Sequence, residues 1–204
     1  MFSLKSLSPT ITDMIRFDHS HVLVTYHQFT ADKPASVKKA LAETICSALD
    51  IHARLEEEIF YPALQQLGIG DQVLHKSVPE HNAMRQIMAD VRAAGADGKQ
   101  LDHLLPQLMR EVMHHVADEE TVLLPQAEQR MSKERLCQLG TDMTARRLQL
   151  LAPQAGKVAI NTAIGFSRST TAVIAAVGMV AAAAVLIKGR RATHLLPRPS
   201  LSLR

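Results

Sequence analysis

The chain of 204 residues has no tryptophan and few other aromatic residues, five phenylalanines and two tyrosines. Proteins that bind single-stranded nucleic acid stack bases on aromatic side chains, so this scarcity argues against that class of function. Only two cysteines are present, Cys46 and Cys137, and they do not form a C-x-x-C motif. This excludes a disulfide framework and a thiolate zinc site, and it fits a reducing compartment.

Acidic residues are missing from the C-terminal part of the sequence. All 20 Asp and Glu residues lie at or before Asp142, so residues 1–151 carry 16 basic residues against 20 acidic ones, a net charge of −4. Residues 152–204 carry seven basic residues and no acidic one, a net charge of +7. The first part has the balance of a soluble domain, and the second that of a segment that meets a membrane or a polyanion. We expect no secretory signal, because the N-terminus lacks a continuous apolar stretch.

Apolar residues recur at three- and four-residue spacing through the first 150 residues, and no alternating pattern indicates a strand. The segments "ADKP", "LGIGD" and "GADG" separate long helices with short loops. We therefore predict an all-α fold, an up-down antiparallel four-helix bundle with a short fifth helix, over residues 8–151. The expected helices span about 8–30 with Ser8 as cap, 35–67, 71–94, 99–129 with kinks at Pro106 and Pro125, and 132–152.

An internal repeat with an offset of 62 or 63 residues runs through this domain. Asp18 and His19 correspond to Glu80 and His81, and the segment "HARLEEEIFYP" at 52–62 has the same layout as "HVADEETVLLP" at 115–125. The matched positions of the two segments are His52 and His115, Glu56 and Glu119, Glu57 and Glu120, and Pro62 and Pro125. The bundle is thus expected to consist of two similar helical hairpins, each with one isolated histidine and one His-x-x-x-Glu pair.

Both His-x-x-x-Glu pairs have the spacing of metal ligands on a helix. Side chains four residues apart lie on one face and can bind a common ion. Both pairs lie in apolar stretches, where a carboxylate without a partner is costly. Imidazole and carboxylate favour iron, with manganese or zinc as competitors, and shared carboxylates suit two cations. Since six side chains cannot fill two octahedra, we also expect open positions. The predicted ligands are His19, His52, Glu56, His81, His115 and Glu119.

The ordered pattern "DHSH…HARLEEEIFYP…EHNAM…HHVADEETVLLP", over about residues 10–130, resembles the hemerythrin-like HHE cation-binding family. The resemblance implies a four-helix bundle with a non-haem di-iron centre that binds or senses O₂, peroxide, nitric oxide or iron. Oxygen-carrying hemerythrins have a pair of histidines one turn apart on the third helix. Here Ser77 and Arg85 stand four residues either side of His81. This departure argues against reversible O₂ carriage and leaves one iron with fewer imidazoles.

Each of these residues also has an ordinary structural interpretation. A lone His19 or His81 is usually a core or surface histidine, and the acidic runs 56–58 and 119–120 are usually solvated. The repeated pattern favours metal binding over a purely structural bundle. Five neighbours are interpreted as not being ligands: Glu57, Glu58 and Glu120 as solvent-facing or next to the ligands, His114 as one step off the ligand face, and Tyr61 as a core or rim residue or a donor near Glu56.

Residues 170–187 are uncharged and apolar and are followed by the basic "KGRR", a pattern of the minimum length for a membrane span. Seven of residues 171–187 are alanine, which weakens insertion, and the alternative is a buried or oligomer-forming helix. We expect a tail anchor that keeps the metal domain in the cytoplasm at the inner membrane, with membrane contact through 170–191. Residues 152–169 would be the linker and 188–204 a basic tail.

Two functions from different classes follow from this sequence. The first is a di-iron binding protein that binds or senses O₂, reactive oxygen or nitrogen species, or iron, as in a stress response. The second is a di-iron enzyme of peroxidase or nitric-oxide-reducing type at the same centre. We expect a binding protein rather than an enzyme, with O₂, NO or H₂O₂ as ligand and no nucleic acid as partner.

Overall fold

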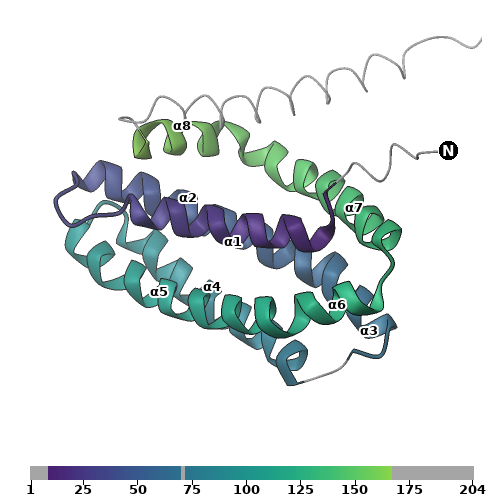
Figure 1. The fold of residues 1–204 in the computed structure, drawn as a ribbon. Coiled ribbons are helices and arrows are strands. Elements are labelled where there is room, and N and C mark those ends of the chain that lie inside the picture. Colours follow the sequence, from purple (N-terminus) through teal and green to yellow (C-terminus); the bar gives the residue numbers. More distant parts are fainter. Residues whose placement is uncertain (1–8, 70–71, 167–204) are drawn as a thin grey trace, which may run out of the picture.

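A computed structural model describes residues 9–69 and 72–166, which form helices and connecting turns without a strand (Figure 1). The all-α class predicted from the sequence is confirmed for these residues. The α-helices are α1 (Ile11–His27), α2 (Ala35–Leu55), α3 (Tyr61–Gln66), α4 (Gln72–Ala94), α5 (Gly98–Asp118), α6 (Leu124–Arg130), α7 (Lys133–Leu151) and α8 (Ala155–Gly165). Shorter turns join them: π-helical η2 (Glu56–Phe60) and η3 (Glu119–Leu123), and the 3₁₀ turn η4 (Ala152–Gln154).

Helix α1 begins later and ends earlier than the span of about 8–30 predicted from the sequence. The Thr10 hydroxyl accepts a hydrogen bond from the Asp13 amide, and the Asp13 carboxylate accepts one from the Thr10 amide, each at 3.1 Å. This reciprocal capping box fixes the start of the helix at Ile11, so Thr10 is the cap in place of Ser8. The helix ends at His27 instead of near residue 30.

The long second and fourth helices predicted from the sequence are each widened by a π-helical turn. The turns begin at Glu56 and Glu119, and the amides of Tyr61 and Leu124 donate to the carbonyls of these glutamates, five residues back. A proline follows each turn, and it lacks an amide and crowds the carbonyl four residues before it. The wider turn accommodates that proline, and such turns are frequent at functional sites.

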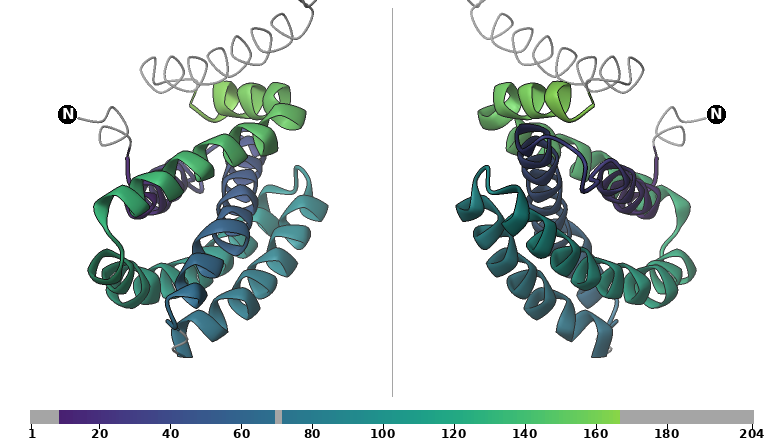
Figure 2. Two further views of the ribbon diagram at one scale, coloured as in Figure 1. Left: turned by 90° about the vertical axis from the view of Figure 1, so that its right-hand side faces the viewer. Right: turned by 90° about the vertical axis from the view of Figure 1, so that its left-hand side faces the viewer.

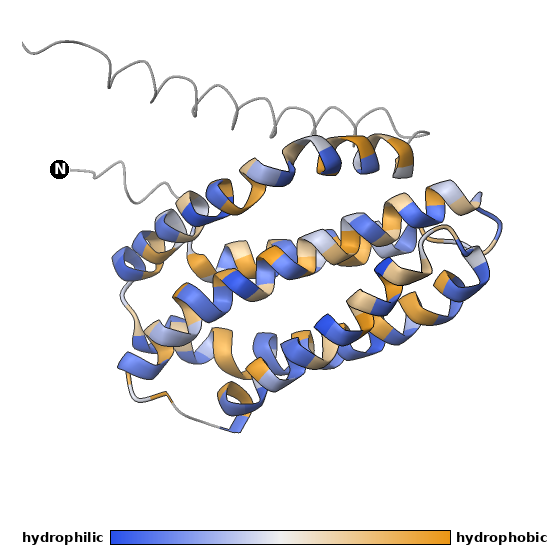
Figure 3. Cartoon of the chain, turned by 180° about the vertical axis from the view of Figure 1, so that it is seen from behind, coloured by the Kyte–Doolittle hydropathy of each residue, from blue (hydrophilic) through white to orange (hydrophobic). Residues whose placement is uncertain are grey.

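The helices are amphipathic, with hydrophobic and hydrophilic residues alternating along each of them (Figure 3). Helix α1 packs against α2, α4 packs against α5, and α2 contacts both α4 and α5. The buried apolar residues form two clusters, one including Ile15, Leu55 and Phe60, the other including Val22 and Met84. Along the chain the buried residues change from one cluster to the other near the predicted ligands, for example between Ile15 and Val22 around His19 and between Val116 and Leu123 around Glu119.

Helices α7 and α8 lie on the α1–α2 side of the molecule, away from α4 and α5 (Figures 1 and 2). A Cβ atom on Gly165 would lie 2.8 Å from the Leu41 side chain, so α8 packs closely on α2. The Lys157 ammonium also pairs with the Glu43 carboxylate of α2 at 2.8 Å. Residues 152–166, expected to be linker, are therefore helical and packed, and the fold extends beyond the predicted boundary at residue 151.

Within residues 9–69 and 72–166, every helix is too short or too polar to cross a membrane. The segment expected to be a membrane anchor, 170–187, and the basic tail, 188–204, lie outside the residues that the structure describes.

Candidate metal centre

The six predicted ligands meet in one buried layer, and none of them is more than 5% exposed. Their nitrogen and oxygen atoms form two groups in which all ligand atoms lie within 4.8 Å of one another. Glu56 belongs to both groups and therefore joins them. The first group is His19, His52, Glu56 and Glu119, and the second is Glu56, His81 and His115.

The first group contains four buried atoms that have no hydrogen-bond partner among the described residues. These atoms are His19 Nε2, His52 Nε2, Glu56 Oε1 and Glu119 Oε2. His19 Nε2 lies 3.4 Å from Glu119 Oε2, and His52 Nε2 lies 3.1 Å from Glu56 Oε1, but neither pair makes a hydrogen bond. Leaving buried polar atoms unsatisfied costs about 1–3 kcal/mol each. A cation between the four atoms would satisfy all of them, so this donor set fits a metal ion.

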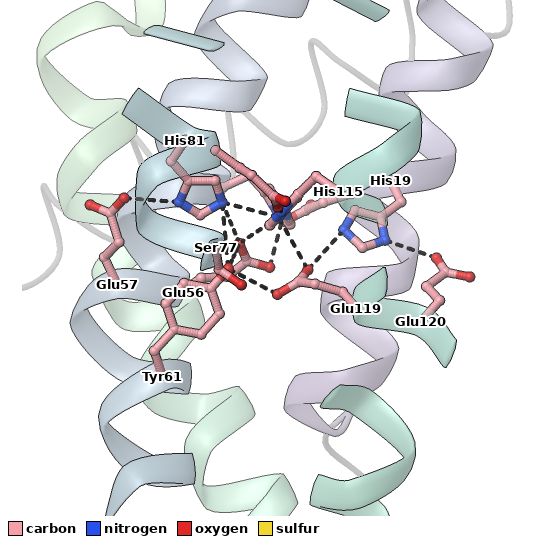
Figure 4. A network of polar contacts seen from close by, with 12 residues as sticks. His19, Glu56, Glu57, Tyr61, Ser77, His81, His115, Glu119 and Glu120 are labelled. Carbon is pink, nitrogen blue, oxygen red and sulfur yellow. Dashed lines mark hydrogen bonds and ion pairs between the residues drawn. The ribbon is translucent and has the colours of Figure 1, made fainter. Parts of the chain in front are cut away.

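The second group is built around Glu56 Oε2. This oxygen lies 3.3 Å from His81 Nε2, and the His81 and His115 Nε2 atoms lie 3.1 Å apart (Figure 4). His115 Nε2 also lies 3.7 Å from Glu119 Oε2. Both glutamates therefore face histidines of both hairpins, as carboxylates shared by two ions would.

The isolated histidine of each hairpin is held by a glutamate from the other hairpin. His19 Nδ1 on α1 lies 2.8 Å from Glu120 Oε1 on η3, and His81 Nδ1 on α4 lies 2.8 Å from Glu57 Oε1 on η2 (Figure 4). A carboxylate at Nδ1 takes the ring proton there and leaves Nε2 free to bind a metal. The sequence left Glu57 and Glu120 as either solvent-facing or next to the ligands, and the structure places both next to the ligands.

The other two histidines are held from within their own hairpin. His115 Nδ1 lies 2.9 Å from Glu80 Oε2, and His52 Nδ1 lies 3.5 Å from Asp18 Oδ2. Arg147 of α7 donates to both oxygens of Asp18 at 2.6 Å. Asp18 and Glu80 are functional candidates that the sequence-based prediction of ligands missed. Their equivalent positions, each directly before a repeated histidine, were the signal that could have revealed them.

Charge in the layer is balanced between imidazoles and carboxylates. Burial disfavours the charged form of His81, but hydrogen bonds to Glu56 and Glu57 outweigh burial and raise its pKa to about 9. Burial likewise opposes ionisation of Glu56, but His52, His115 and His81 hold its pKa well below the usual range. Burial also opposes ionisation of Asp18, whose pKa the hydrogen bonds to His52 and Arg147 lower to about 2. The metal-free layer is therefore held together by ion pairs.

Tyr61 is part of this layer and not a rim residue. Its side chain is buried, and its hydroxyl donates to Glu119 Oε1 at 2.9 Å and lies 3.2 Å from Glu56 Oε2 (Figure 4). Burial, together with these two carboxylates, raises the pKa of the Tyr61 hydroxyl, so in the metal-free protein it is protonated. Tyr61 is therefore both a buried core residue and the donor near Glu56, two of the interpretations that the sequence left open.

A small cavity adjoins the histidines. It has a volume of about 20 Å³, and its polar lining consists of Asp18 and the four histidines. The rest of its lining is apolar: Val22, Leu49, Ala53, Met84, Met88, Val112 and Val116. Since a water molecule needs about 10–15 Å³ by this measure, the cavity suits a ligand of one or two heavy atoms.

The remaining candidate side chains lie outside the layer. The His114 side chain is 68% exposed and belongs to a surface group with Glu80 and Asp118, in which Lys76 pairs with both carboxylates. Glu58 is paired with Arg146 on the surface. His114 and Glu58 are therefore not ligands of the buried centre, in agreement with their sequence-based interpretation.

The glutamates at Nδ1 make a testable contribution to metal affinity. We expect Glu57→Gln to weaken metal binding by about 10–100-fold, because the amide no longer fixes the tautomer of His81. The adjacent Glu58→Gln, which removes only surface ion pairs with Arg54 and Arg146, should change the affinity by less than twofold. Titration of both variants with ferrous iron under nitrogen measures the difference, and equal affinities for the two would contradict the role of Glu57.

The fold and this layer together define a class, a helical metal-binding domain with paired histidine and glutamate groups. The family model described as "Hemerythrin HHE cation binding domain" matches residues 10–127, and the chain belongs to that family. The chain is also 26% identical over 142 residues to a protein described as "DNA nickase" from Nostoc sp. (strain PCC 7120 / SAG 25.82 / UTEX 2576). That match covers 69% of this chain and 40% of the nickase, so the chain spans less than half of that relative. No solved structure matches the chain.

Proposed function

We propose that this protein is a non-haem di-iron binding protein that binds or senses a small oxidant, nitric oxide or iron itself. Two iron ions would lie in an up-down bundle formed by α1, α2, α4 and α5. His19 and His52 would bind one ion, and His81 and His115 would bind the other. Glu56 and Glu119 would each bind both ions. The observation that carries the proposal is the buried group of four atoms, two imidazole nitrogens and two carboxylate oxygens, that have no hydrogen-bond partner in the part of the chain that the structure describes.

The donor set supports iron over its competitors. Four imidazoles and two carboxylates are a borderline-hard set that suits iron, while structural zinc sites commonly use thiolates. The two cysteines are buried but lie outside both groups of candidate ligands. Manganese and zinc are the competing ions, and metal analysis of the protein as purified distinguishes them.

The cavity beside the histidines supports a small exogenous ligand. Its volume of about 20 Å³ and its mostly apolar lining fit O₂, nitric oxide or hydrogen peroxide and exclude larger organic substrates. The bound irons would supply the open coordination positions and the electron transfer that such ligands require. The protein's own residues would exclude bulk water and hold the imidazoles in place through the Nδ1 carboxylates.

The test is metal analysis of the full chain, followed by optical spectra before and after addition of O₂, nitric oxide and peroxide. We expect two irons per chain and a spectral change with at least one of these ligands. Fewer than two irons in anaerobically loaded protein would contradict the centre. Sustained turnover of peroxide or nitric oxide would assign the enzyme function instead. Supercoiled plasmid incubated with the same protein should remain intact.

A further inference from the structure

Tyr61 breaks the internal repeat of the polar layer. The residue 63 positions later is Leu124, a fully buried member of the apolar core. We propose that Tyr61 is a ligand, through its deprotonated oxygen, of the metal ion held by His81 and His115, so that the two metal positions differ chemically. This inference rests on the proposed di-iron centre and adds a seventh ligand to it.

The position of the Tyr61 oxygen is that of a coordinating atom. It lies 2.9 Å from Glu119 Oε1, 3.2 Å from Glu56 Oε2 and 3.4 Å from His81 Nε2. Nitrogen and oxygen atoms that bind a first-row ion at about 2.0–2.2 Å, and at right angles to each other, lie roughly 3 Å apart. The hydroxyl therefore has the spacing from three candidate ligand atoms that neighbouring ligands of one ion have.

The small side chain of Ser77 leaves room for the tyrosine. Ser77 lies one turn before His81 on α4, on the same face, and is fully buried. Its hydroxyl donates to the Val73 carbonyl at 2.8 Å and lies against the Tyr61 oxygen (Figure 4). The Tyr61 ring stacks on the His81 ring with centroids 5.8 Å apart. Tyrosine thus occupies the space in which a second histidine on α4 would lie.

Binding would exchange one bond for another without a change of oxidation state. The O–H bond of Tyr61 breaks, an oxygen–metal bond forms, and the proton leaves to bulk water. The anionic, hard phenolate stabilises ferric iron at this position more than ferrous iron. The position of His19 and His52 has Leu124 in place of the tyrosine and gains no such ligand.

The chain offers a matched pair of variants, because Tyr61 and Tyr26 are its two tyrosines. Ferric protein should show a visible charge-transfer band and phenolate modes in resonance Raman spectra. We expect Tyr61→Phe to lose the band and these modes while retaining two irons per chain. Tyr26→Phe should keep the band, the phenolate modes and the two irons. Metal loading of Tyr61→Phe should also release one proton fewer per chain. In wild-type protein produced in cells supplied with ring-deuterated tyrosine, the phenolate Raman modes should shift. This measurement requires no substitution.

Each result separates this inference from the proposed function. Iron-loaded wild-type protein without phenolate modes, or a band unchanged in Tyr61→Phe, would overturn the role of Tyr61 and leave the di-iron centre standing. Absence of bound iron would instead overturn the centre itself. If Tyr61→Phe fails to fold, as judged by circular dichroism, the isotope shift in Tyr26→Phe protein decides, because Tyr61 is then its one remaining tyrosine.

Discussion

The Glu56→Gln, Glu119→Gln double variant is expected to bind no iron, whereas we expect the wild-type protein to bind two irons per chain. Both carboxylates are fully buried, and each faces histidines of both hairpins. An amide keeps the shape of the side chain but removes the negative charge that a buried cation needs. Since each glutamate is proposed to be shared, losing both removes the charge compensation of both ions at once.

The experiment compares iron content after anaerobic loading and desalting. The matched control is Glu58→Gln, Glu128→Gln, which also removes two carboxylates but from surface pairs with Arg146 and Arg16. The control should bind two irons. Circular dichroism checks that the double variant is folded. Two irons retained by folded Glu56→Gln, Glu119→Gln protein would contradict the proposed ligand set.

The metal-free protein is expected to lose stability as the pH rises from about 6.5 to 9. A histidine side chain ordinarily has a pKa of about 6.5, and the pKa of His81 is raised to about 9 in the folded protein. Its ion pairs therefore contribute fully below pH 6.5, and the contribution is lost as the pH rises through 9. The shift in the pKa of His81 corresponds to a contribution to the free energy of unfolding on the order of 3 kcal/mol. The pKa values of His19 and His115 are raised as well and change stability in the same direction.

Metal binding should reverse the pH dependence of stability. Ligand histidines must be neutral to bind a metal, so affinity increases with pH over the range in which the free protein becomes less stable. Urea unfolding at pH 6.5, 7.5, 8.5 and 9.5, with chelator or with iron, measures both slopes. His81→Gln should flatten the slope of the metal-free protein, whereas His114→Gln, at an exposed position, should not. A metal-free protein of constant or increasing stability would show that the buried imidazoles are not protonated below pH 9.

The helical class and the six candidate ligands followed from the sequence because both depend on local spacing. Four-residue spacing places His52 with Glu56 and His115 with Glu119 on one helix face whatever the rest of the fold. The 63-residue offset then indicated that two such faces are equivalent. The start of α1 was predicted less accurately, because the capping box of Thr10 and Asp13 caps the helix in place of Ser8.

Contacts between distant segments could not be derived in the same way. Arg147 reaches Asp18 across 129 residues and from a helix outside the repeat, so no spacing rule connects them. The residue equivalent to Tyr61 in the second hairpin is Leu124, and a position occupied by leucine suggests a core residue rather than one of the polar layer. Helix α8 contains glycine at both ends, a composition typical of a linker, yet the missing side chain of Gly165 is what allows its close contact with Leu41.

Each hairpin supplies a glutamate that holds a histidine of the other hairpin, Glu57 to His81 and Glu120 to His19. One hairpin alone therefore does not contain a complete set of contacts for either metal position. A single hairpin, such as α1 with α2, would have its isolated histidine without the carboxylate that fixes the ring. Two copies of one hairpin, related by a two-fold axis, would supply that carboxylate to each other. The present chain has the arrangement that fusion of such a self-associating pair would produce. Within one chain the two hairpins need not be identical, and they differ at Tyr61 and Leu124.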